Sequence, residues 1–304
     1  MNEKQLQGKV SEILVNNGLN FRIDKEPLTS EVSGRPSGYF GLYNSVTNEC
    51  LNTVGENYTV SQNDEIVEVV LRGMNNFGNL SVHKAASING GRRIVCQLAI
   101  EGESKVNKDV IKRYVTIIDS NDGSTALSVG IGDITMSCLN QFFRFYKAGN
   151  AKFRHTATMA EKLKTIPSLI EIALGESMKQ VEIYNKMAQV KATPKMIHEL
   201  VGDLLGHSEL NIRDKNITGK ALSHMEKLYG NINHEMADKG KTVWGLFSGA
   251  TRWTTHDIAI TQTKRGKMKR NNADIESMTG GRAYAHNQTA YDYAVKQLHK
   301  SVLV

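Results

Sequence analysis

The stretch HKAASINGGRRIVCQLAI (residues 83–100) has the pattern of a β-hairpin, and the interpretation of the first half of the chain starts from it. Two strand-like runs flank Asn89-Gly90-Gly91, and a tight turn needs the positive φ angles that asparagine and glycine tolerate. Arg92 and Arg93 stand at the root of the returning strand, with one expected on each face. A hairpin does not require two arginines there, so we treat them as candidate binding residues.

A second hairpin follows the first. Lys112 and Arg113 begin the strand KRYVTIIDS, the turn is Asn121-Asp122-Gly123, and STALSVGIGDITMSC (124–138) returns. Before both hairpins, residues 63–78 have the apolar spacing of an amphipathic helix, with Asn63 as a possible N-cap. This order predicts a small antiparallel sheet with a helix on one face.

The flanking segments are predicted from their composition and spacing. Residues 1–60 are predicted to be irregular with short strands. From Leu139 the pattern becomes helical, and residues 139–160 carry four cations and no acid: Arg144, Lys147, Lys152 and Arg154. Further helices are predicted over 168–190, 194–206, 218–229, 242–256 and 284–300.

The predicted fold class is therefore α+β, with a small hairpin sheet covered by helices and then a mostly helical C-terminal half. We predict two domains. Residues 1–157 form an α+β core with the two hairpins, and residues 158–304 form a helical region that contains the basic segment 264–270.

Charge is unevenly distributed along the chain. Residues 1–80 hold six Lys and Arg against ten Asp and Glu, a balance of −4. Since the net charge of the whole chain is +7, residues 81–304 have a balance of +11. A basic body favours a polyanionic partner, and nucleic acid is the first candidate. A solvated basic surface explains the charge equally well.

Cysteine content and hydropathy bear on location. Cys50, Cys96 and Cys138 are widely spaced and form neither a disulfide framework nor a zinc motif, so we expect small buried residues. No apolar run approaches the roughly 18 residues that a membrane span requires. The sequence predicts a protein of the cytoplasm with no membrane contact.

Motifs of catalysis are not evident. The chain lacks a P-loop, GIGDIT lacks the third glycine of a dinucleotide loop, and DSNDGST fits a turn better than a calcium loop. His155 could be catalytic, but a structural or phosphate-side role is favoured. The acids Asp119, Asp122 and Asp133 cluster too loosely for a metal site. We therefore expect no enzyme activity, no cofactor and no metal.

Several motifs occur in order along the chain, and together they are specific: NNGLNFRIDKEPL (16–28), VGENYTVSQNDE (54–65), AASINGGRRIVCQLAI (85–100), DSNDGSTALSVGI (119–131), CLN (138–140), KFRHT (152–156) and TVWGLFSGATRWTTH (242–256). With them the chain resembles the phage/plasmid-like family built on the domain of unknown function catalogued as number 932. It departs from the family pattern in the aromatic-rich QFFRFYKAG (141–149) and in KRGKMKR (264–270).

The resemblance implies an accessory protein of phage or plasmid genomes, close to replication or recombination functions. The predicted order of helix, two hairpins and long basic helix is similar to the core of single-strand annealing recombinases, which form rings or filaments around single-stranded DNA. By this analogy the partners are single-stranded DNA and further copies of the chain.

In that interpretation, cations from the hairpins and from the basic helix form the two walls of a DNA groove. A groove that follows the phosphate backbone of a strand requires regularly placed cations. One wall holds Arg92, Arg93, Lys112 and Arg113, and the other holds Arg144, Lys147, Lys152 and Arg154. The basic segment is a possible arm on phosphates: Lys264, Arg265, Lys267, Lys269 and Arg270.

Two alternatives stay open at this point. One is an interaction or counter-defence protein that binds a host protein through its acidic N-terminal part and its helical half. The other is a nuclease in which acids such as Asp119 and Asp133 hold a metal.

Overall fold

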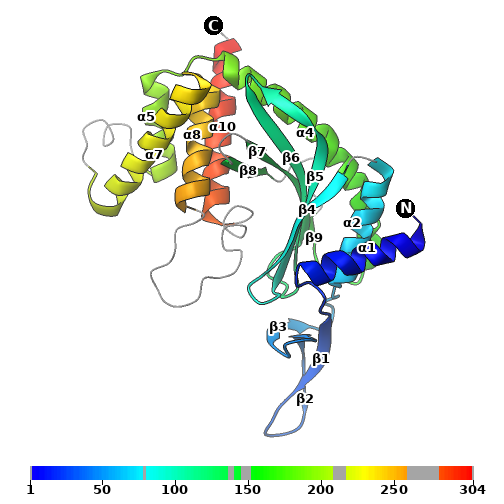
Figure 1. Cartoon of the computed structure of the whole chain (residues 1–304). Coiled ribbons are helices and arrows are strands. Elements are labelled where there is room, and N and C mark those ends of the chain that lie inside the picture. Colours follow the sequence, from blue (N-terminus) through cyan, green and yellow to red (C-terminus); the bar gives the residue numbers. More distant parts are fainter. Residues whose placement is uncertain are drawn as a thin grey trace.

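The computed structural model describes residues 2–77, 80–135, 140–144, 152–207, 217–258 and 281–302. A curved antiparallel sheet occupies the middle of the molecule (Figure 1). Helices α1, α2 and α4 lie along one side of it, a bundle of helices lies at the other side, and a small three-stranded sheet projects from one end. The fold is α+β, in agreement with the prediction.

The elements follow one another in three groups. The N-terminal group is α1 (Glu3–Asn16), β1 (Ile23–Thr29), β2 (Pro36–Asn44), β3 (Cys50–Gly55) and α2 (Asn63–Phe77). The main sheet contains β4 (Leu80–Ile88), β5 (Arg93–Val106), β6 (Asp109–Ser120), β7 (Leu127–Thr135), β8 (Asn140–Arg144) and β9 (Lys152–Phe153). The remaining helices are α3 (Met159–Leu163), α4 (Ile166–Gln189), α5 (Pro194–Leu205), α7 (Gly219–Lys239), α8 (Val243–Trp253), the π-helix η1 (Thr254–Ile258) and α10 (Arg282–Val302).

The N-terminal segment is more regular than its sequence suggested. The prediction of irregular structure over residues 1–60 is wrong for α1, which is closed by a capping box between Asn2 and Gln5. Short strands were expected after it, and β1, β2 and β3 form an antiparallel sheet around a small core of Phe21 and other apolar residues.

Both predicted hairpins are confirmed. Strands β4 to β8 pair in sequence order, and β9 pairs with β7. The turn after β4 has positive φ at Asn89, Gly90 and Gly91, as its composition requires. A β-bulge interrupts the pairing of β4 with β5 between Val82 and Lys84.

Alternation along the strands gives the main sheet two distinct faces. Ile94, Cys96 and Leu98 of β5 point toward α1, α2 and α4, where they join a core with residues such as Val70 and Ile170. Val95, between them, belongs to a separate small cluster on the opposite face. The helix predicted over 63–78 is therefore one of several that contribute to the core on the first face.

The helical half packs through a close pair of helices, α7 and α8. A Cβ atom on Gly249 would lie 2.4 Å from the Cα of Ile232, and one on Gly245 would lie 2.3 Å from the carbonyl oxygen of Gly240. These glycines, both in the motif 242–256, let the two backbones approach closely. Thr193 caps α5 and Gly206 ends it with φ of 70°, as predicted.

A buried ionic cluster joins this pair of helices to the sheet. The Lys239 ammonium lies 2.8 Å from Asp109 at the start of β6 and 3.4 Å from Glu235, and Trp244 donates its indole N–H to Asp109 at 2.8 Å. Arg252 lies 3.3 Å from the second oxygen of Glu235. The cluster fixes the β5–β6 turn against the bundle.

Helix α4 contributes to both halves. Ile170 and Ala173 pack on the sheet, whereas Tyr184 and Met187 belong to the core of the bundle. The division at residue 157 therefore stays a prediction. Among the described residues, no helix is both long and apolar enough to cross a membrane. Cys96 is buried as expected, Cys50 is exposed against expectation, and Cys138 lies outside the described residues.

Candidate functional site

Arg92 and Arg93 make contacts within the protein. The Arg92 guanidinium donates to the carbonyl oxygens of Leu51 and Cys50, the latter at 3.2 Å, and lies 3.5 Å from Glu49. Arg93 donates through Nε to Ser124 Oγ at 3.1 Å. The expectation that Arg92 faces a DNA groove stays a prediction, and in the structure its guanidinium holds the projecting sheet against the hairpin turn.

Lys112 and Arg113 point to opposite faces of β6. Arg113 is only 7% exposed and donates to Ser177 Oγ of α4 at 2.9 Å. Burial lowers the pKa of Arg113, an effect that the charge of Asp133 partly offsets. Lys112 is exposed on the face that α4 does not cover. Only the lysine of this predicted pair is accessible to a phosphate.

The second predicted wall is not a helix. Residues 140–144 form β8 and residues 152–153 form β9, so the expectation of a basic helix over 139–160 is wrong there. Arg144 pairs with Ile131 and Lys152 with Ser128, and Arg154 is exposed just after β9. The side chains of Arg144 and Lys152 lie outside what the structure describes, as do Lys147 and the whole segment Lys264, Arg265, Lys267, Lys269 and Arg270.

An exposed group that the sequence did not single out lies beside Lys112. The β-bulge in β4 brings His83 and Lys84 to the face that carries Lys112. His83 packs its ring on Tyr114 with 4.6 Å between ring centroids, and partial burial together with the charges of Lys84 and Lys112 lowers the pKa of His83. We call His83, Lys84 and Lys112 the sheet-face patch.

The sheet-face patch has few competing partners. Within the described residues, neither Lys84 nor Lys112 forms an ion pair. Glu101 and Glu103 are exposed on β5 just after Ile100, the residue that pairs with Arg113. These two acids limit the cationic surface at that end. The patch therefore consists of two lysines around one exposed aromatic ring.

A buried polar cluster lies at the end of the sheet near the projecting β1–β3 unit. Ser61 donates to Asp119 Oδ2 at 2.5 Å, and His155 Nε2 lies 2.9 Å from Asp119 Oδ1. His155 Nδ1 lies 3.2 Å from the carbonyl oxygen of Thr59, and Tyr58 stacks on the imidazole at 5.0 Å. Both Asp119 oxygens are thus engaged, and a substrate could not reach the Ser61 hydroxyl without local opening.

Electrostatics make this cluster an ion pair. Burial alone would lower the pKa of His155, but the hydrogen bond and charge of Asp119, with the Thr59 carbonyl, raise it above its ordinary value. Burial is also the main cause that raises the pKa of Tyr58. With Nε2 on Asp119 and Nδ1 on Thr59, the imidazolium has an acceptor for each N–H. The cluster is suited to fastening three chain segments together.

Motif segments from distant parts of the sequence meet around this cluster. Asn121 donates to Asn63 Oδ1 at 3.1 Å and to the Gly91 carbonyl at 2.8 Å, and Asn63 donates to the carbonyls of Leu19 and Phe21. Asn63 thus serves this network rather than acting as the predicted helix cap. Five of the motifs that carry the family resemblance contribute to it, so much of their polar content is explained by folding.

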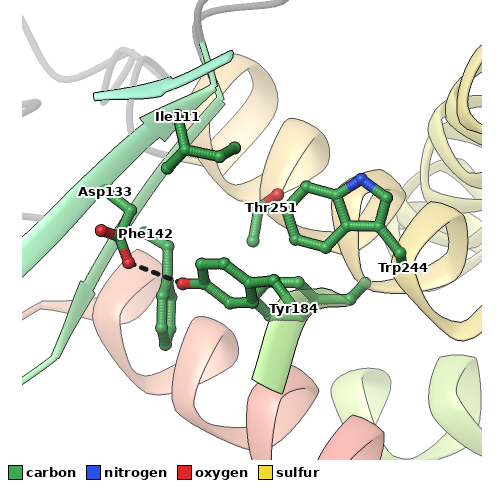
Figure 2. Close-up of a pocket in the computed structure, with 7 residues that line it drawn as sticks. Ile111, Asp133, Phe142, Tyr184, Trp244 and Thr251 are labelled. Carbon is green, nitrogen blue, oxygen red and sulfur yellow. Dashed lines mark hydrogen bonds between the residues drawn. The ribbon is translucent and has the colours of Figure 1, made fainter. Parts of the chain in front are cut away.

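Asp133 lies in a different place, between the sheet and the bundle. Its Oδ2 accepts a hydrogen bond from Tyr184 at 2.7 Å, and its Oδ1 has no hydrogen-bond partner in the described part of the chain. Figure 2 shows the small cavity beside it, with room for about one water molecule, lined by Ile111, Asp133, Phe142, Tyr184, Trp244, Phe247 and Thr251. Asp119 and Asp133 therefore belong to separate clusters. Among the described residues, no group of three or more His, Cys, Asp or Glu could hold a metal.

Replacement of Asp133 by asparagine is expected to stabilise the protein at alkaline pH. Burial raises the pKa of Asp133 from 3.8 to about 7, against smaller lowering effects of Tyr184 and Arg113. A raised carboxyl pKa means that ionisation costs stability as pH rises from about 4 to about 7, by up to about 4 kcal/mol. Asp133→Asn removes this cost and keeps an acceptor for Tyr184. Urea unfolding at pH 6 and pH 9 measures the gain, and a variant that is equally destabilised at both pH values contradicts it.

Comparison with known proteins yields one match. The family model described as "Domain of unknown function (DUF932)" matches residues 50–275. No curated protein and no solved structure matches the chain.

Proposed function

Because this chain belongs to the DUF932 family, which is defined by a domain of unknown function, we propose its function from the sheet-face patch. We infer that the protein binds single-stranded DNA across the face of β4 to β6 that carries Lys84 and Lys112, without cofactor chemistry. The observation that carries the proposal is the position of these two lysines, which have no ion-pair partner among the described residues and flank an exposed aromatic ring.

Charge supports a polyanionic ligand. Residues 81–304 have a balance of +11, and both lysines of the patch belong to this part. Lysines bind phosphates as point charges and release counterions, which supplies affinity without sequence preference. Single-stranded DNA adds unpaired bases that an exposed ring can contact.

The order of elements supports an annealing-type role in recombination or replication. Helix α2, the strands β4 to β7 and the long helix α4 follow one another in an order similar to that of single-strand annealing recombinases. The long helix is 166–189 and not 139–160, and it carries two Lys against three Glu, so it is not the basic helix of that comparison. This is an analogy at the level of the fold. The proposal includes a homo-oligomer, a ring or filament, acting in the cytoplasm of a host cell for a phage or plasmid.

Binding of the unmodified protein is the direct test. A labelled single strand is titrated at several salt concentrations, with duplex of the same sequence as competitor, and annealing of complementary strands is measured in parallel. We expect binding that weakens steeply with salt and prefers the single strand. Failure to bind a single strand at low salt overturns the proposal.

A second candidate function is supported by the projecting sheet. Val32 is 98% exposed, Val46 66% and Tyr39 58%, all in or beside β2. Exposed apolar side chains on a projecting unit suit a protein partner, as in the alternative of a phage interaction or counter-defence protein. Under this alternative a captured host protein stays bound at high salt and is lost when Val46 is replaced by serine. Salt-sensitive binding to DNA alone argues against it.

A further inference from the structure

We propose that one base of the bound strand stacks on the imidazole ring of His83, with Tyr114 supporting this ring from beneath. The inference rests on the proposed function and deepens it, because it names the part of the nucleic acid that His83 recognises. Lys84 and Lys112 then hold phosphates on either side of the stacked base.

The rings of His83 and Tyr114 pack against each other as a tilted pair. His83 is exposed, whereas Tyr114 is 3% exposed, and their centroids are 4.6 Å apart with 45° between the ring planes. A buried tyrosine that contacts one side of the imidazole limits its motion and leaves the other side to solvent. A preorganised ring loses little conformational entropy when a base stacks on it.

The surroundings leave room for a base. Tyr114 of β6 pairs with Ala99 of β5, and Ala99 pairs in turn with Ser81 of β4. Both neighbours have small side chains, and both are at least partly exposed. A flat ligand can therefore lie over His83 without displacing a large side chain.

The cations stand where a strand passing over His83 would place its phosphates. Lys84 follows His83 on β4, and Lys112 is on β6 two residues before Tyr114. Lys84 lies level with Thr116 of β6, four residues from Lys112, so the lysine backbones are separated by roughly 10 Å across the sheet and about 13 Å along it. A base on the ring between them brings its flanking phosphates toward one lysine each.

Charge on His83 would not explain binding at neutral pH. Partial burial and the charges of Lys84 and Lys112 lower the pKa of the His83 imidazole. The ring is then mostly neutral near pH 7 and contributes by stacking. Bases inside a duplex are already stacked and paired, so this contact is specific to unpaired nucleotides.

The test compares His83→Ala and His83→Phe with the unmodified protein, on an oligothymidine strand and on an abasic strand of the same length. We expect His83→Ala to weaken binding to oligothymidine by about 5- to 150-fold with an unchanged salt slope. His83→Phe should restore most of the affinity, and the abasic strand should not distinguish the variants. His234→Ala, at an exposed histidine on α7, is the matched control and should bind normally.

The outcomes separate the inference from the proposed function. If His83→Ala binds oligothymidine as the unmodified protein does, or weakens both strands equally, stacking is overturned while DNA binding stands. If the unmodified protein binds neither strand at low salt, the proposed function itself has failed. Thermal unfolding of each variant shows that the fold is intact, as an exposed position predicts.

Discussion

Replacement of Lys239 by alanine is expected to lower the free energy of unfolding by about 3–5 kcal/mol. The Lys239 side chain has no exposed surface, and its ammonium lies 2.8 Å from Asp109 and 3.4 Å from Glu235. Without it, Asp109 loses the ammonium at 2.8 Å, and Glu235 keeps only Arg252 of its two cations. Because Asp109 begins β6 and Lys239 ends α7, a buried ionic contact between sheet and bundle is lost with it, while the Trp244 hydrogen bond to Asp109 remains.

Urea unfolding at neutral pH measures this effect. Lys241→Ala is the matched control, because Lys241 is two residues away and exposed, and we expect it to stay within about 0.5 kcal/mol of the unmodified protein. A loss below about 1 kcal/mol for Lys239→Ala would show that the buried cluster does not hold the two parts together.

The second large effect is expected for Asp119→Ala. Asp119 is completely buried and accepts from Ser61 at 2.5 Å and from His155 at 2.9 Å. Its removal takes away the hydrogen bond and charge that hold His155 protonated against its burial, and the loss of this ion pair costs about 3 kcal/mol or more at pH 6. Asp122→Ala, in the adjoining turn and partly exposed, should cost no more than about 1 kcal/mol.

The pH dependence gives a sharper form of this prediction. Since the folded-state pKa of His155 is raised above its ordinary value of 6.5, the ion pair contributes fully below about pH 6.5, and its contribution is lost as pH rises through the folded-state pKa. The difference in stability between the unmodified protein and Asp119→Ala should therefore be larger at pH 6 than at pH 9. Equal differences at the two pH values would contradict an ionised His155.

The hairpins could be predicted from sequence because their turns are chemically local. Asn89, Gly90 and Gly91 all have positive φ, and so does Gly123 in the turn of the second hairpin. The helix α1 was missed although its signals were present, an Asn2–Gln5 capping box and apolar residues at Leu6 and Val10. Local chemistry is sufficient to specify the start of this helix.

Strand β8 and the role of Arg92 required tertiary information. The run NQFFR is too short for its period to separate helix from strand, and pairing with β7 decides the outcome. Arg92 finds its acceptor 41 residues away in β3. A cation at a strand end shows that a partner is needed but does not show which one.

The candidate site could be predicted only in part. Lys112 was predicted and is accessible, whereas its neighbour Arg113 is buried against α4. His83 and Lys84 were missed because a β-bulge, which the sequence does not mark, brings them to one face. His83 and Lys84 are near Lys112 only because β4, β5 and β6 pair side by side in the sheet.

The most direct test of the central claim is the salt dependence of single-strand binding by Lys84→Ala/Lys112→Ala. Lys4→Ala/Lys9→Ala is the matched control, since these exposed lysines lie on α1, which covers the opposite face. If each lysine of the patch neutralises one phosphate, its double variant should reduce the slope of log K against log salt by about 1.4, with the control unchanged. If the patch variant has the same slope as the unmodified protein, DNA does not bind this face.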